Sequence, residues 1–105
     1  MKLVIQPEVE IGAHTYQIRW WNKKMKHAAD ATAQSTPKYQ VIRLDPDWSD
    51  TMRFEHLIHE IKHQIEYLLG EDSTERYITA GCSFLTQAML SLGIEPDFSL
   101  ITEEE

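Results

Sequence analysis

The chain has 105 residues, of which 42% are hydrophobic and 26% are charged, and its formal net charge is −7. This length and composition predict one globular domain spanning residues 1–105, without a separate substrate domain. The single cysteine, Cys82, excludes an internal disulfide, and no apolar run suits a signal peptide or a membrane span. We therefore expect a cytoplasmic protein with no membrane partner.

The charge is distributed unevenly along the chain. Residues 1–43 carry seven Lys or Arg and three acidic side chains, which gives a net charge of +4. Residues 44–105 carry three Lys or Arg and fourteen acidic side chains, which gives a net charge of −11. Nucleic-acid binding needs clustered cations that face the phosphates. We therefore expect no nucleic-acid partner. An acidic decoy that mimics nucleic acid is a further hypothesis, which depends only on the charge of the second half.

Three short segments rich in β-branched and aromatic residues are predicted to be strands, namely residues 2–5, 16–21 and 39–44. Residues 22–37 between the second and third strands are polar and lack a clear period, which indicates a loop or a short helix. The third strand ends at an Asp-Pro-Asp turn and is expected to lie at an edge of the sheet. Such an edge can pair with an extended peptide through its free backbone groups.

A long helix is predicted over residues 49–69, which contain no proline or glycine. Ser49 or Asp50 can serve as its N-cap, and Gly70 stands where a C′ glycine belongs. Apolar residues at helical spacing form one stripe, which is expected to pack against the sheet. This stripe consists of Phe54, Leu57, Ile58, Ile61, Ile65 and Leu68.

This helix contains an H-E-x-x-H motif, His59-Glu60-Ile61-Lys62-His63. Its two histidines share one face of the helix, about 6 Å apart along the axis, and lie opposite the apolar stripe. Both imidazoles can reach one Zn²⁺, and Glu60 can address a metal-bound water. A shuffled chain of this composition contains such a motif with a probability of roughly 2%, which favours a metal site facing a cleft over two incidental histidines.

A second helix is predicted to open at residues 72–75 and to run to about Leu92, where Gly93 supplies the C′ stop. Its expected apolar face consists of Tyr77, Ile78, Gly81, Phe84, Leu85, Ala88 and Met89. The tail over residues 102–105 is expected to be disordered.

Catalytic zinc requires three protein ligands and an open position for water. All five histidines lie at or before His63, so a third ligand further along the chain must be a carboxylate or Cys82. Glu75 is the best candidate, because it heads the second helix on the same face as Ile78 and Cys82. In the competing interpretation, Glu75 forms a helix cap together with Asp72.

The identity of the third ligand depends on how far along the helix axis Glu75 lies from the histidines. A tight antiparallel return would leave Glu75 below the histidines and bring Thr79 or Cys82 level with them, whereas a steep helix crossing would bring Glu75 to the metal. Cys82 is therefore the second candidate, and the weaker ones are Glu66, Glu71 and Asp72.

The H-E-x-x-H motif followed by Glu75-x-x-Ile78-x-x-Gly81 resembles the gluzincins. The resemblance covers approximately residues 39–92 and extends to minimal gluzincins and small phage- or prophage-encoded metallopeptidases. It implies an α+β truncated zincin core, in which a small three-stranded sheet precedes the motif helix and a second packing helix. It also implies hydrolysis of peptide bonds, with one zinc ion held by His59, His63 and Glu75 and with Glu60 as the catalytic base.

Two functional hypotheses follow. The first is a zinc metallopeptidase acting on a peptide or protein substrate, with Tyr67 or Tyr77 as candidates for stabilising the oxyanion. The second is a catalytically inactive zincin-like interaction module with structural zinc or none, because 105 residues leave little room to enclose a substrate. His56, one turn before His59, is expected to be a surface residue or to support the site indirectly.

Overall fold

The computed structural model describes residues 1–21, 33–36, 40–71 and 73–103, with the backbone alone for residues 33–36. The described part of the chain has α+β architecture, as predicted. Its elements are β1 (Lys2–Val4), β2 (Glu8–Ile11), β3 (His14–Trp20), β4 (Ala33–Thr36), β5 (Val41–Leu44), α2 (Asp50–Leu69), α3 (Glu75–Ser91), β6 (Glu95–Asp97) and β7 (Thr102–Glu103).

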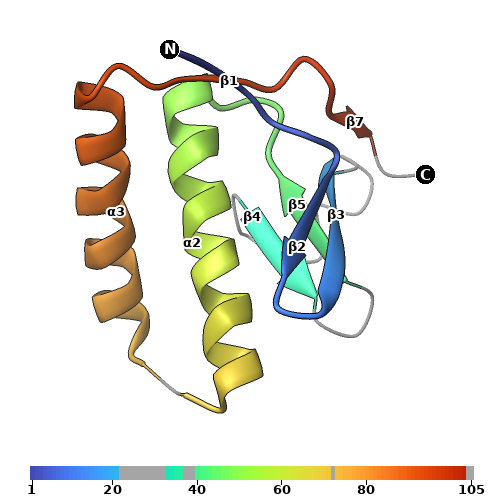
Figure 1. Cartoon of the computed structure of the whole chain (residues 1–105), viewed down its shortest axis with the longest axis vertical. Coiled ribbons are helices and arrows are strands. Elements are labelled where there is room, and N and C mark those ends of the chain that lie inside the picture. The colour runs from blue at the N-terminus through green and yellow to red at the C-terminus, as the bar shows by residue number, and fades with distance from the viewer. Residues whose placement is uncertain (22–32, 37–39, 72, 104–105) are drawn as a thin grey trace.

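The elements form three layers, with α2 between the sheet and α3 (Figure 1). The predicted stripe of α2 faces the sheet. Phe54 and Leu57 are buried there against Tyr16, Ile42 and Leu44, and Ile58, Ile61 and Ile65 pack at the margin of the same core. The opposite side of α2, which carries the motif histidines, is therefore directed away from the sheet.

A mixed sheet of five described strands replaces the predicted three. Its order is β2-β3-β5-β4, and β7 also pairs with β3. The additional strand β2 is joined to β3 by a two-residue turn that begins at Gly12. Gly12 has a φ of 63°, and a glycine with positive φ at the first turn position is what a type II′ hairpin requires. Residues 8–11 do alternate acidic and apolar side chains, but four residues are too short for a clear strand signal.

The expectation that the strand over residues 39–44 forms a sheet edge is wrong. β5 lies inside the sheet, parallel to β3 on one side and antiparallel to β4 on the other. β4 comes from the segment expected to be a loop or short helix, and Ala33-Gln34-Ser35-Thr36 has no apolar alternation that would reveal a strand. Among the described strands, β4 therefore forms the edge of the sheet beside α2 (Figure 1).

The two ends of the described chain are held by parallel pairings. β1 pairs with β6 after α3, and β7 pairs with Arg19 and Trp20 of β3. The expectation of a disordered tail is therefore wrong for Thr102 and Glu103, while residues 104 and 105 lie outside the described part. Pairings this distant in sequence leave no local pattern from which they could be predicted.

The caps of α2 agree with the sequence, whereas the start of α3 differs. Ser49 is the N-cap of α2 and accepts a hydrogen bond from the Met52 amide, and Gly70 closes the helix with a φ of 69°. The N-cap of α3 is Thr74, whose side chain accepts from the amide of Tyr77. Because Thr74 fills this role, the carboxylate of Glu75 is not needed to cap the helix.

Candidate metal site

The two motif histidines meet on the side of α2 that faces α3. Their Nε2 atoms are 3.0 Å apart, and their ring centroids are 4.7 Å apart. Both side chains are partly shielded, with exposed fractions of 18% for His59 and 32% for His63. The spacing of four residues on an unbroken helix thus brings both imidazole nitrogens to one point, as the motif predicts.

Glu75 reaches this point from the first turn of α3. One carboxylate oxygen, Oε1, lies 2.6 Å from His59 Nε2, and the other, Oε2, lies 2.9 Å from His63 Nε2. α3 begins above the lower end of α2, because the connection climbs beside the end of α2 before the helix starts (Figure 1). The sequence argument that Glu75 would lie below the histidines assumed a tight turn between the helices. The longer connection removes this difficulty, because an extended residue spans about 3.3 Å and a few of them recover the height of two helical turns.

The three side chains form a donor set suited to zinc. His59, His63 and Glu75 each offer one ligand atom, and these atoms lie within 4.8 Å of one another. Ligands bound tetrahedrally to zinc at about 2.1 Å are about 3.4 Å apart, so the contact distances of 2.6–3.0 Å must widen by less than about 1 Å. Two neutral imidazoles and a carboxylate leave one tetrahedral position for another ligand.

Glu60 lies on a buried flank of α2, between the histidine side and the face that packs on the sheet. Its exposed fraction is 8%. Gln64, one turn further along, is almost fully buried, and its Oε1 atom has no hydrogen-bond partner within the described part of the chain. The motif predicts the position of Glu60, but sequence reasoning missed Gln64, whose only signal is that it follows Glu60 at i+4.

The alternative third ligands do not join the histidines in the described residues. Cys82 is buried on α3, and this burial raises the pKa of its thiol, which disfavours the thiolate that zinc requires. Glu66 is buried beside Lys62, with 3.9 Å between Glu66 Oε1 and Lys62 Nζ. Glu71 is exposed outside the ligand group, and Asp72 lies outside the described residues.

The tyrosines proposed for the oxyanion lie on the surface. Tyr67 and Tyr77 are both about two-thirds exposed. Within the described residues, neither tyrosine is hydrogen-bonded to the histidines. The geometry therefore supports the ligand set and leaves the oxyanion without an assigned donor.

His56 lies against the exposed indole of Trp48, with ring centroids 6.1 Å apart. Burial lowers the pKa of His56 below its ordinary value of 6.5. The unfolded chain therefore binds more protons near pH 6, and His56 makes the fold less stable as pH falls below about 6.5.

We expect the His56→Gln variant to lose less stability than the wild type between pH 7.5 and pH 5. Urea unfolding with a chelator present measures this difference, because the other titrating groups are shared by both proteins. Parallel losses in the two proteins would contradict the role of His56.

No protein-family model, curated protein or solved structure matches the chain. Across the described residues, neither helix combines the length and the apolar character needed to cross a membrane. What the site can do therefore follows from its own side chains.

Proposed function

We propose that this protein is a zinc-dependent metallopeptidase of the gluzincin type with a truncated zincin core. The observation that carries the proposal is the convergence of His59 Nε2, His63 Nε2 and the Glu75 carboxylate within 3.0 Å of one another across two helices. A sheet followed by the motif helix and a second helix that supplies the glutamate supports the same conclusion.

In this proposal His59, His63 and Glu75 hold the metal. When bound, zinc supplies Lewis acidity, which polarises the scissile carbonyl and makes water more acidic. Glu60 follows His59 directly on α2, and its carboxylate accepts a proton from the attacking water and delivers it to the leaving amine. The burial of Glu60 limits competition from bulk solvent for that proton.

The proposed substrate is a peptide in an extended conformation. β4 forms one edge of the described sheet, and α2 packs beside it. A peptide that pairs with the outer side of β4 would add a strand to the sheet next to the motif helix. The site where a peptide can pair is therefore β4, rather than the strand over residues 39–44 inferred from the sequence.

Cleavage of an unstructured peptide library by the zinc-loaded protein tests the proposal. We expect cleavage products in mass spectra, their loss with 1,10-phenanthroline and their return when zinc is added. A protein that binds zinc at the three ligands but cleaves no peptide would instead support an interaction module with structural zinc. A protein that binds no zinc would contradict both forms of the proposal.

A further inference from the structure

An exposed stripe of α3 is apolar and has no covering layer in the described structure. The inner side of α3 buries Ile78, Cys82 and Thr86 toward α2. α3 is the outermost layer in Figure 1, and its other side points away from the molecule. We use the term outer α3 face for the exposed residues Tyr77, Gly81, Phe84, Leu85, Ala88 and Leu92, which form one stripe along the helix. The exposed residues Ala80, Gln87 and Ser91 lie beside this stripe.

The outer α3 face exposes four large hydrophobic side chains. The exposed fractions are 68% for Tyr77, 72% for Phe84, 53% for Leu85 and 83% for Leu92. With about 170–200 Å² for each such side chain, these four expose roughly 500 Å². The largest apolar patch on a typical monomer measures about 300–600 Å² and is often functional, so an apolar area of this size is a candidate interaction surface.

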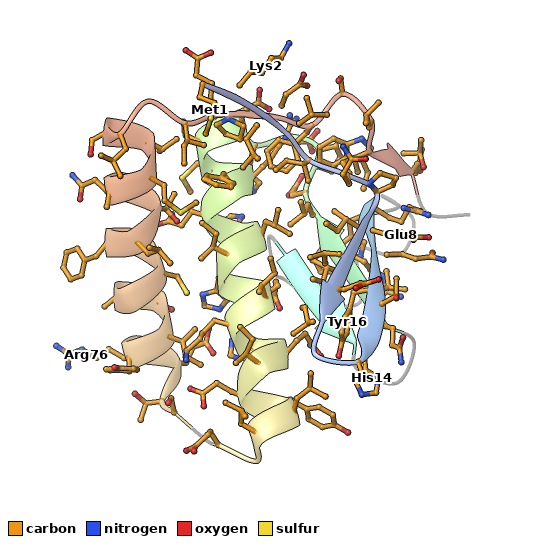
Figure 2. The ribbon with its side chains drawn as sticks, in the orientation of Figure 1. Met1, Lys2, Glu8, His14, Tyr16 and Arg76 are labelled. Atoms are coloured by element: carbon orange, nitrogen blue, oxygen red, sulfur yellow. The ribbon has the colours of Figure 1, made fainter. Side chains whose placement is uncertain are left out.

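The charge pattern indicates what can cover this face. No charged residue occurs from Tyr77 to Ile94, although the whole chain has a net charge of −7. Arg76, at the start of α3, points away from α2 at the end of the face and is its one flanking cation (Figure 2). A membrane-surface helix would carry several cations beside its apolar face, so a lipid surface is disfavoured. An uncharged face also lets two acidic molecules approach without direct repulsion.

The order of the side chains makes the outer α3 face complementary to itself. When two copies of α3 pack antiparallel about a twofold axis between residues 84 and 85, residue i faces residue 169 − i of the other copy. Large residues then lie level with large ones, with Tyr77 at the height of Leu92 and Phe84 at the height of Leu85. Gly81 meets Ala88, and a Cβ added at Gly81 would touch nothing, so the two backbones can approach closely there.

We propose that the outer α3 face is the interface of a homodimer in which two α3 helices pack antiparallel. This contact is isologous, as twofold dimers require. About 500 Å² from each copy gives a total near 1,000 Å², the size of a weak or transient interface, so we expect the dimer to form only at high protein concentration. The proposal does not depend on metal binding, because the ligands lie between α2 and α3.

Sedimentation velocity across about 1–500 μM protein, with a chelator present, tests the dimer. We expect the wild type to shift from monomer to dimer and Phe84→Glu to remain monomeric, because it places two buried charges near the twofold axis. Leu100→Glu is the matched control, since Leu100 is exposed but lies outside α3. A monomeric wild type, a dimeric Phe84→Glu or a monomeric Leu100→Glu would each overturn the proposal.

Cysteine cross-linking tests the antiparallel register. The double variant Gly81→Cys/Ala88→Cys should form interchain disulfides on mild oxidation, because each cysteine faces the other position in the partner. Each single variant should cross-link poorly, since its two equivalent cysteines are about 10 Å apart along the helices, beyond the reach of a disulfide. The wild type controls for Cys82. Equal cross-linking of single and double variants would overturn the antiparallel arrangement.

Discussion

The His63→Ala variant is expected to bind no zinc under conditions in which the wild-type chain binds about one ion. His63 Nε2 lies 3.0 Å from His59 Nε2 and 2.9 Å from Glu75 Oε2, so alanine removes one of three converging ligand atoms. Loss of a residue that merely supports a ligand weakens metal binding 10- to 100-fold, and loss of a ligand should weaken it by more than ~100-fold. Plasma mass spectrometry of protein purified without a polyhistidine tag measures the stoichiometry.

Thermal unfolding provides a second measurement of the same site. A zinc ion held by both helices binds the folded chain and should stabilise it by about 2.7 kcal/mol at a free concentration 100 times the dissociation constant. The His63→Ala variant should gain almost none of this stabilisation. The control is Glu71→Ala, which removes an exposed carboxylate of the connection between the helices and should bind zinc as the wild type does.

The Glu75→Ala variant distinguishes the ligand sets. Loss of zinc in both Glu75→Ala and His63→Ala supports the three-ligand site. If only Glu75→Ala retained zinc, the third ligand would be Cys82 or a different carboxylate. Zinc retained in His63→Ala would contradict the site altogether, and the close contacts would then be those of a histidine–histidine–carboxylate hydrogen-bond cluster.

The Glu60→Gln variant is expected to keep its zinc but to lose peptide hydrolysis by a factor of about 10²–10⁴. Glutamine preserves the size of this buried side chain but cannot accept the proton of the attacking water. The rate on a peptide identified from the library, compared at equal zinc content, measures the effect. Because Glu60 is outside the ligand set, the zinc stoichiometry should not change.

Glu55→Gln is the matched control for this substitution. Glu55 lies on the same helix, is partly buried and does not belong to the ligand group, so the variant makes the same change of charge. Its rate should stay close to that of the wild type. Equal rates in Glu60→Gln and the wild type would show that another group accepts the proton, whereas equal losses in both variants would point to the charge of α2 as a whole.

The sequence alone determined the parts of the protein that depend on neighbouring residues. The stripe from Phe54 to Ile65, the cap at Ser49 and the stop at Gly70 specify α2, because helix periodicity and capping are local properties. The same periodicity places His59 and His63 together on the side away from the core. It also places Glu60 next to the ligands, so the chemistry proposed for α2 could be predicted without the tertiary structure.

Only the tertiary structure decided which groups from other segments meet this helix. Glu75 joins the histidines because the connection climbs before α3 begins, and the rise of that connection is not encoded in the spacing of twelve residues. β4 pairs with the following strand β5 and takes one edge of the sheet, whereas β6 and β7 formed through pairings between distant segments. Similarly, the predicted apolar face of α3 is divided between a side packed on α2 and an exposed side. The physical reason is that a local pattern gives the direction of a side chain on its own element, whereas its partner depends on how the whole chain packs.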